Sequence, residues 1–383
     1  MYFDLQPKSR REDLFDMEEQ MERLLSMLRG RREAFPLVVV KGRRRTGKTS
    51  LIKTALSTSG LPHLILDGMA FSGTPRIKGR SLLRVLEREL NRCVKEQGGW
   101  REKLLQALRG VRWIKIDSEP PWIHFEWDKP ERELDLLDLI HSFREFATRN
   151  GTRFILVLDE AQELKRVAGF SFQKLMAHVY DHVGEIQMIV SGSQAGLLDE
   201  FLGLRDPSSP LFGRGVAEVE VSELPEERAL EFLRKGFEQA GLRVEEEVLH
   251  SAVRKLGGTI GWLTLFGAKA VEAKRASEEI LELTLEIASG LEAREFSNFL
   301  RVRKRAAKRY LAIMRTAAGM EGSSWKNLKR GLEMEEGRRI ADNIFSHLLQ
   351  ELVDAGFMRK SDGVYSVADP ILQRALRLGK TGE

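Results

Sequence analysis

The stretch GRRRTGKT, from Gly42 to Thr49, has the residue types and the spacing that bind a nucleoside triphosphate. It fits the pattern G-x-x-x-x-G-K-[ST] and lies between a strand-like apolar run and a helical pattern, the context in which this pattern binds phosphate. Gly42 and Gly47 let the backbone turn close to the phosphates, so that consecutive N–H groups and a helix N-terminus face the anion. The pattern predicts that Lys48 reaches the β- and γ-phosphates and that Thr49 binds Mg²⁺.

Three arginines in a row occupy the middle of this loop, where backbone N–H groups rather than side chains face the ligand. We expect their side chains to point outward and to raise the positive potential at the mouth of the site. They can also pair with acids such as Glu226 or Glu227. The predicted nucleotide-binding set is the whole loop: Gly42, Arg43, Arg44, Arg45, Thr46, Gly47, Lys48, Thr49 and Ser50.

An acidic pair, Asp159 and Glu160, closes the apolar run FILVLDE. On its own such a pair is equally typical of a helix cap. In a chain that also has a phosphate loop, it predicts that Asp159 holds Mg²⁺, directly or through water. Glu160 is then placed to orient and deprotonate an attacking water molecule.

Two further polar groups are candidates for contact with the γ-phosphate. The strand ending VSGSQ is expected to lie between the loop strand and the Asp159 strand, so that Ser191, Ser193 or Gln194 faces the phosphate; we favour Ser193 over a plain strand-end turn. Arg214 follows a glycine and precedes a strand, and it either reaches across the site or lies on the surface. The predicted catalytic residues are Glu160, Lys48, Arg214 and Ser193.

Five strand patterns must position these groups, and helical patterns separate them. This alternation predicts a mostly parallel, doubly wound α/β sheet, with a hairpin at residues 113–127 and a helix at residues 133–148 inserted into it. The pattern changes twice further on. Residues 223–300 are helical and are interrupted at LGGTIGWL, whereas residues 301–383 read as three helices followed by a β-hairpin around Asp362-Gly363. That order predicts a winged helix-turn-helix, whose third helix buries Ile340, Ile344, Leu348, Leu349 and Leu352.

Charge is distributed unevenly along the 383 residues, although the net charge is only +5. Residues 301–383 carry 17 basic and 10 acidic residues. Within residues 301–330 there are ten basic residues and one acidic residue, Glu321. Such an excess is typical of a polyanion partner, the alternative being a solvated surface. The winged helix is therefore expected to contact double-stranded DNA, with a protein partner, an intramolecular role or RNA as alternatives. The predicted contacts are Arg301, Arg303, Lys304, Arg305, Lys308, Arg309, Arg339, Asn343 and His347.

Composition excludes several other classes of protein. The longest apolar runs, LVVV and FILVL, are too short to cross a bilayer, and residues 1–15 lack the apolar core of a signal peptide. Cys93 is the only cysteine, which rules out an internal disulfide and fits the cytoplasm. His178 and His182 are four residues apart but have no third metal ligand nearby, so we expect them to be structural.

Taken together, these motifs resemble the archaeal-type ATPases of the STAND class, which are relatives of AAA+ proteins. The matching pieces are FDMEEQMERLL, VVVKGRRRTGKTSLIK, LVLDEAQ, IVSGSQ, PLFGRGVAEVEV, LGGTIGWL and VADPILQRALR. The resemblance implies a P-loop ATPase α/β domain at residues 1–222, a helical lid at 223–300 and a winged helix-turn-helix domain at 301–383. It also implies ATP and Mg²⁺ as ligands. Two positions depart from the family: Met17 stands where an arginine is usual, and Ile260 where a proline is usual.

The resemblance further implies a slow, ATP-driven molecular switch rather than a metabolic enzyme. Our first hypothesis is an ATPase whose winged helix contacts DNA. The alternatives are a signalling scaffold that self-associates or binds a protein partner, and an initiator-like loader ATPase.

Overall fold

A five-stranded parallel sheet forms the centre of the chain in a computed structural model, which describes residues 1–30, 35–125, 136–320 and 322–381. The spatial order of its strands is β2-β5-β6-β1-β7. Their bounds are Leu37–Lys41 for β1, His63–Asp67 for β2, Phe154–Asp159 for β5, Ile186–Gly192 for β6 and Ala217–Glu220 for β7. The predicted doubly wound parallel sheet is confirmed, and β6 lies between the loop strand and the Asp159 strand, as expected.

Helices cover both faces of this sheet, which explains why β1 and β5 are apolar on both sides. Val38 and Val40 of β1 pack against α1 (Glu18–Arg29) and α2 (Lys48–Ser59). Leu37 and Val39 point to the opposite face, which is covered by four helices. These are α3 (Gly79–Glu96), α5 (Leu136–Arg149), α6 (Phe172–His182) and α7 (Ala195–Leu202).

An insertion between β2 and β5 carries α4 (Arg101–Leu108) and an antiparallel hairpin of β3 (Ile114–Ile116) and β4 (Ile123–Phe125). The predicted hairpin is confirmed up to Phe125, whereas its last residues, 126 and 127, and residues 133–135 of the next predicted helix lie outside the described residues. Short 3-10 helices complete this half of the chain: η1 (Arg11–Asp13), η3 (Gly68–Phe71) and η4 (Ala161–Arg166).

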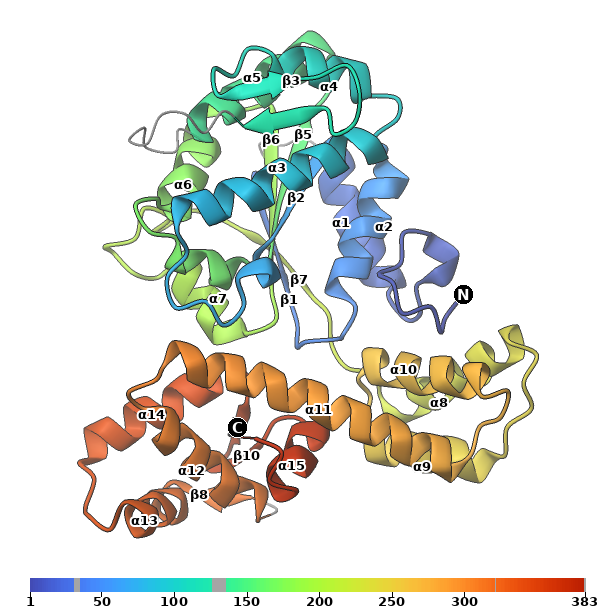
Figure 1. Ribbon diagram of the computed structural model, residues 1–383, viewed down its shortest axis with the longest axis vertical. Helices are drawn as coiled ribbons and strands as arrows, with labels where there is room; N and C mark the ends of the chain where they lie inside the picture. Colours follow the sequence, from blue (N-terminus) through green and yellow to red (C-terminus); the bar gives the residue numbers. More distant parts are fainter. Residues whose placement is uncertain (31–34, 126–135, 321, 382–383) are drawn as a thin grey trace.

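A separate helical group follows the sheet. The lid helices α8 (Glu226–Gln239), α9 (Glu246–Leu256) and α10 (Ile260–Glu272) share an apolar core with the start of α11 (Glu278–Val302). Figure 1 shows α11 running from this group to the C-terminal group as one continuous helix. It passes through the expected boundary between residues 300 and 301, and the three domain boundaries stay predictions.

The C-terminal group has the predicted winged-helix order of three helices and a hairpin. Its elements are α12 (Ala307–Ala318), β8 (Ser323–Ser324), α13 (Trp325–Glu336), α14 (Asp342–Asp354), β9 (Met358–Ser361), β10 (Val364–Val367) and α15 (Pro370–Arg377). The hairpin turn has positive φ values of 50° at Asp362 and 79° at Gly363, as such a turn requires. Within the described residues, no helix is long and apolar enough to span a membrane.

One detail of this group was predicted wrongly. The third helix begins at Asp342, so Ile340 and Arg339 precede it. Its buried stripe consists of Phe345, Leu348, Leu349 and Leu352, whereas Ile344 is 45% exposed. Arg339 therefore does not belong to the outer face of this helix, although Asn343 and His347 do.

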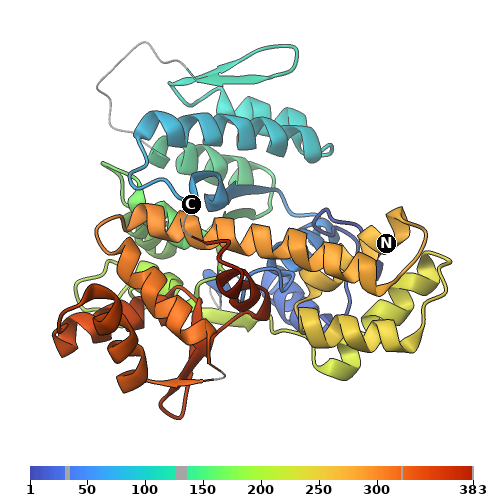
Figure 2. The ribbon, with the colours of Figure 1, turned by 60° about the horizontal axis from the view of Figure 1, so that its bottom comes forward.

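The winged helix packs back on the rest of the chain. Figure 2 shows α12–α15 at one end of α11 and the lid helices at the other. α15 packs along α11, and the end of α14 meets the start of α7, where a Cβ atom on Gly196 would collide with Asp354. α7 directly follows β6, so the winged helix contacts the sheet domain next to its predicted active edge.

Candidate nucleotide-binding site

The loop between β1 and α2 has the close backbone approaches that require glycine. Gly47 has a φ of 100° and directly precedes α2, and a Cβ atom at Gly42 would collide with the carbonyl oxygen of Val221. α2 begins at Lys48, so its N-terminal N–H groups lie at the loop. The loop therefore has the shape that surrounds an anion with backbone donors.

Lys48 is buried at the inner side of this loop. Its Nζ donates a hydrogen bond to the carbonyl oxygen of Arg43 at 2.7 Å and lies 3.9 Å from Oε1 of Glu160. Burial lowers the pKa of the Lys48 ammonium, and the neighbouring carboxylates of Glu160 and Asp159 offset this effect only in part. A phosphate group at the loop would compete for the Nζ hydrogens that Arg43 now accepts.

Thr49 and Asp159 come together at the carboxyl ends of β1 and β5. The Thr49 hydroxyl donates to Oδ2 of Asp159 at 2.8 Å, and the Ser191 hydroxyl donates to Oδ1 of the same carboxylate. A hydroxyl and a carboxylate beside a phosphate site are oxygen ligands that suit Mg²⁺. The described residues contain no cluster of three or more His, Cys, Asp or Glu side chains that could hold a metal by themselves.

Glu160 is held in a fixed orientation by residues after β5 and β6. Its Oε2 accepts hydrogen bonds from the backbone N–H of Ser193 at 3.1 Å, the Ser193 hydroxyl at 2.6 Å and Nε2 of Gln162 at 2.7 Å. Burial alone would raise the pKa of Glu160, but the cations of Lys48 and Arg44, together with the hydrogen bonds from Ser193 and Gln162, outweigh burial and lower it. The carboxylate is therefore ionised, and its Oε1 faces the phosphate loop.

Arg44 and Arg45 bind acids of α11. Arg44 Nη1 lies 2.9 Å from Oε2 of Glu295, while Arg45 Nη2 lies 3.0 Å from Oε1 of the same residue. Arg45 also approaches Oε1 of Glu292 at 3.7 Å and stacks its guanidinium 4.1 Å from the ring centre of Trp262. Two arginines of the phosphate loop thus connect it to one helix.

Arg43 binds two further acids. It forms an ion pair with Glu223, and its Nη2 lies 3.6 Å from Oδ2 of Asp369, the residue that caps α15. Glu223 also accepts hydrogen bonds from the Thr259 hydroxyl at 3.0 Å and from Arg359 of β9 at 2.8 Å. The loop arginines do point outward, as expected. The prediction that they pair with Glu226 or Glu227 was wrong, because their ion pairs are with Glu223, Glu292, Glu295 and Asp369.

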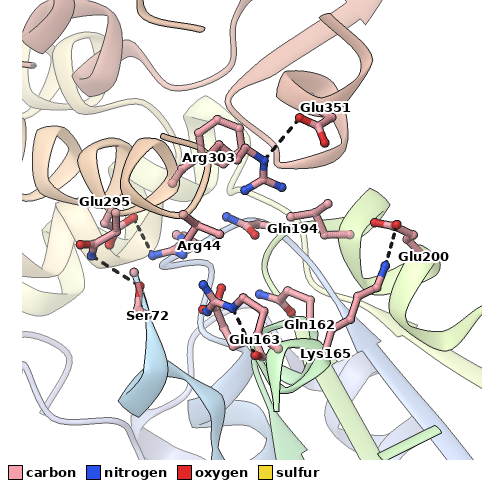
Figure 3. Close-up of a pocket in the computed structure, with 16 residues that line it drawn as sticks. Arg44, Ser72, Gln162, Glu163, Lys165, Gln194, Glu200, Glu295, Arg303 and Glu351 are labelled. Carbon is pink, nitrogen blue, oxygen red and sulfur yellow. Dashed lines mark hydrogen bonds and ion pairs between the residues drawn. The ribbon is translucent and has the colours of Figure 1, made fainter. Parts of the chain in front are cut away.

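Two cavities border this arrangement. A cavity of ≈ 490 Å³ lies beside the phosphate loop, and its walls come from the loop, the N-terminal residues and the lid helices. A second cavity, of ≈ 250 Å³, lies between the sheet domain and the winged helix. Figure 3 shows Gln162 and Gln194 at this second cavity, with the Lys165–Glu200 and Arg303–Glu351 pairs on its walls. Arg44 and its ion-pair partner Glu295 both line the two cavities.

Comparison with known proteins identifies the family. Residues 14–266 match the family described as the ATPase domain predominantly from Archaea. The chain belongs to this ATPase family. Residues 304–367 of the ATPase match the C-terminal winged helix-turn-helix domain of MCM proteins. No curated protein matches the chain.

Two solved structures are similar along nearly the whole ATPase. A Walker-type ATPase of Pyrococcus abyssi has 30% identity, with 98% of this chain and 100% of that chain covered and a TM-score of 0.79. The ORC2 protein of Aeropyrum pernix, solved in ADPNP-ADP complexes, has 14% identity, with 99% and 98% covered and a TM-score of 0.60. The second similarity is one of fold. The narrower assignment to the STAND class stays a prediction.

Arg214 of the ATPase is engaged away from the phosphate loop. Its Nε donates to Oδ1 of Asp181 on α6 at 3.0 Å, and its guanidinium lies 5.8 Å from the ring centre of Tyr180. A catalytic role for Arg214 stays a prediction that requires it to leave Asp181. His178 and His182 lie on the same helix with ring centres 5.3 Å apart, and they belong to no metal cluster within the described residues.

The predicted nucleic-acid contacts divide into two sets. Arg301 donates to the carbonyl oxygen of Gly73 at 3.0 Å, while Arg303 and Arg309 form ion pairs with Glu351 and Glu336, so these three are engaged within the chain. The open set consists of exposed side chains: Lys304, Arg305 and Lys308 in and near the turn before α12, Arg339 before α14, and Asn343 and His347 on α14.

Proposed function

We propose that this ATPase is a nucleotide-dependent switch, in which ATP bound at the phosphate loop changes the position of a winged helix that contacts double-stranded DNA. One observation carries the proposal. All three arginines of the loop form ion pairs with acids outside the sheet domain or at its exit: Glu223, Glu292, Glu295 and Asp369. The same loop that would receive the phosphates is therefore attached to the helix that carries the winged helix.

The switch follows from competition for these arginines. A triphosphate at the loop brings several negative charges to the guanidinium groups of Arg44 and Arg45, which now neutralise Glu295. If Arg44 or Arg45 turns toward the phosphates, the partly buried Glu295 of α11 loses an ion-pair partner, which is costly. α11 can relieve this cost by moving, so the two nucleotide states favour different positions of the winged helix.

We propose that hydrolysis is slow. Glu160 would accept a proton from the attacking water, but Lys48 and Arg44 lower its pKa, and a carboxylate with a lowered pKa is a weak base. Three hydrogen bonds also occupy its Oε2. Mg²⁺ held by Thr49 and Asp159 would supply positive charge beside the transferring phosphoryl group.

The open basic set supports DNA as the ligand of the winged helix. Lys304, Arg305 and Lys308 are exposed within five residues of one another, a density of positive charge that suits a phosphate backbone. Asn343 and His347 add exposed polar groups on α14, of a kind that contacts base edges or phosphates.

Fluorescence anisotropy with labelled duplex DNA tests the proposal. The full chain is compared without nucleotide, with ADP and with a non-hydrolysable ATP analogue, each at two salt concentrations. We expect the DNA affinity to differ between the ADP and ATP-analogue states and to fall steeply with salt. Equal affinity in all nucleotide states would refute the switch, and no binding in any state would refute DNA as the ligand.

A second candidate function is a scaffold whose winged helix binds protein, and the packing of α14 on α7 favours it. That contact already uses the end of the helix that would read DNA, next to Gly196. A scaffold predicts self-association or capture of a partner that differs between ATP and ADP, which light scattering measures. An initiator-like loader, the third hypothesis, predicts preference for particular duplex sites in the anisotropy experiment.

A further inference from the structure

A groove of ≈ 390 Å³ lies at the elbow, residues 303–306, where the chain passes from α11 to α12. Figure 2 shows α12 folded back beneath this end of α11. Two small side chains, Ser297 on α11 and Ala307 at the start of α12, leave space between the helices. The groove shares no lining residue with the cavity beside the phosphate loop, so nucleotide binding does not account for it.

The floor of this groove is apolar. Leu300 is 8% exposed and belongs to the core of the winged helix. Ala307 and Leu311, one turn apart on α12, are half-buried and pack against the same core. A hollow with an apolar floor between two helices suits the apolar side chains of a third helix, a recurring mode of peptide recognition.

The rim of the groove is positively charged. Arg301, Lys304 and Lys308 lie on it, and no acidic side chain is among its eight lining residues. Arg301 donates hydrogen bonds from Nε to the carbonyl oxygen of Gly73 at 3.0 Å and from Nη2 to Oδ1 of Asn298 at 2.8 Å, and neither acceptor neutralises its charge. None of the three cations forms an ion pair with another described residue. The rim therefore lacks a counter-charge, which an acidic ligand supplies.

The floor and the rim together distinguish a protein ligand from a nucleic acid. The phosphates of a DNA duplex can reach the exposed Lys304 and Lys308, but a phosphate backbone has no apolar group that packs on Leu300 or Leu311. An amphipathic helix with acidic residues has both kinds of group, because one face is apolar and the other carries carboxylates.

We propose that the groove between α11 and α12 is a docking site for an acidic amphipathic helix of a partner protein. The apolar face of that helix packs on Leu300, Ala307 and Leu311, and its carboxylates pair with the cations of the rim. Docking requires neither nucleotide nor DNA, so it does not depend on the proposed switch. Because Lys304 and Lys308 also belong to the open basic set, the partner and DNA compete for the elbow.

Fluorescence anisotropy with three labelled peptides and the full chain, without nucleotide, tests the docking. The first peptide has about 18 residues, long enough to form a helix, with leucines at i, i+3, i+4 and i+7 and glutamates on the opposite face. The second peptide has alanine in place of each leucine, and the third has glutamine in place of each glutamate. We expect the first peptide to bind at least about tenfold more tightly than either of the others.

Two variants assign the binding to the groove. Ala307→Leu fills the hollow without a change in charge, so it should weaken the first peptide about tenfold and leave DNA affinity within about twofold of wild type. Lys304→Glu with Lys308→Glu should weaken both peptide and DNA. Lys326→Glu with Arg330→Glu, at exposed positions of α13, makes the same change in charge and is the matched control, which should bind the peptide like wild type.

The contrary results name the other occupants. Equal binding of the leucine and alanine peptides overturns the proposal and leaves DNA as the ligand of the rim. Loss of self-association in Ala307→Leu, measured by light scattering, overturns it in favour of a second copy of this chain. An unchanged peptide affinity in Ala307→Leu, or no saturation of wild type by the first peptide below about 1 mM, also overturns it.

Discussion

Two runs of cations in this ATPase look alike in the sequence but have opposite surroundings in the structure. Each arginine of the phosphate loop, Arg43 to Arg45, forms at least one ion pair with an acid of another element. In and near the turn between α11 and α12, Lys304, Arg305 and Lys308 are exposed, and none of them forms an ion pair within the part of the chain that the structure describes.

The difference shows that a basic run is not by itself a binding site. The loop arginines are partly buried and fixed by carboxylates, so their charge holds elements in place until a stronger anion competes. The charge at the turn is screened only by solvent, so it is available to a polyanion at once. Four variants would break or sharpen this contrast between an internal and an open cluster.

The largest effect is expected at Glu160. Glu160→Gln keeps the shape of the side chain but removes the base, so the hydrolysis rate should fall about 100-fold or more while ATP still binds. Phosphate release under single-turnover conditions measures the rate, and DNA binding without nucleotide should be unaffected. A variant that hydrolyses ATP as fast as wild type contradicts the assigned base.

Lys48→Ala should abolish most of the affinity for ATP, because the only side-chain cation buried within the loop is lost. We expect the Kd for ATP to rise about 100-fold, the equivalent of about 3 kcal/mol. Lys53→Ala, one turn further along α2, is the control and should bind like wild type. Similar affinities of the two variants would exclude Lys48 as a phosphate ligand.

At the open cluster, replacing Lys304, Arg305 and Lys308 with glutamate should weaken DNA binding about tenfold or more. The slope of log affinity against log salt should fall by about 1 for each lost phosphate contact. Anisotropy measures both, and the basal ATPase rate should not change. Replacing Arg303 and Arg309 with glutamate instead breaks their ion pairs with Glu351 and Glu336. The main effect of that change should therefore be a lower Tm. Unaltered DNA affinity in the triple variant would remove the open cluster from the proposed interface.

The last effect is on stability and concerns the acid side of the internal cluster. Burial, together with Glu295 and Asp369, raises the pKa of Glu292 to about 8 from an ordinary value of 4.5, despite the opposing effect of Arg45 and Arg44. Between these two values the native state holds one proton more than the unfolded state. The free energy of unfolding therefore falls as pH rises, by at most about 1.4 kcal/mol per pH unit.

Glu292→Gln should remove this part of the pH dependence between about pH 5 and pH 8. Urea unfolding at four pH values measures it, with the exposed Glu226→Gln as the control. The same slope in Glu292→Gln and wild type would show that Glu292 does not titrate as described.

The part of the site that depends on local pattern could be predicted from the sequence. The phosphate loop and the Asp159-Glu160 pair each follow one strand, and parallel strands end at the same edge of a sheet. Their order along the chain also implied that β6 lies between β1 and β5, which the structure confirms. The proximity of Thr49 to Asp159 follows from these two facts.

The contacts between the loop and the other domains could not be predicted in the same way. Arg43 and Glu223 are 180 residues apart, and Arg45 and Glu295 are 250 residues apart. No periodicity connects residues at such separations, because their distance depends on how whole domains pack. Glu226 and Glu227 were expected to be the partners because they begin the lid in sequence, but Glu295 lies on a later helix that reaches the loop.

The start of α14, and with it the set of residues on its buried face, was predicted wrongly for a local reason. Ile340 and Ile344 fit a helical stripe with Leu348, and this stripe assumed that the helix begins at Gly337. The helix begins five residues later, where Asp342 forms an ion pair with Lys329 of α13. Once Ile340 lies outside the helix, Phe345 completes the apolar stripe, and Arg339 leaves the face that was expected to read DNA.

α11 is long enough to carry a movement from one part of the molecule to another. Its 25 residues form an unbroken rod about 37 Å long, with Glu292 and Glu295 closer to its winged-helix end than to its lid end. A tilt of only about 5° about one end would displace the other by about 3 Å, which is the length of a hydrogen bond. A tilt about the lid end therefore moves the winged-helix end, where Arg303 and Glu351 meet, about 1.4 times as far as it moves Glu295. The stiffness of α11 therefore determines how much of a movement at the phosphate loop is transmitted to the C-terminal domain.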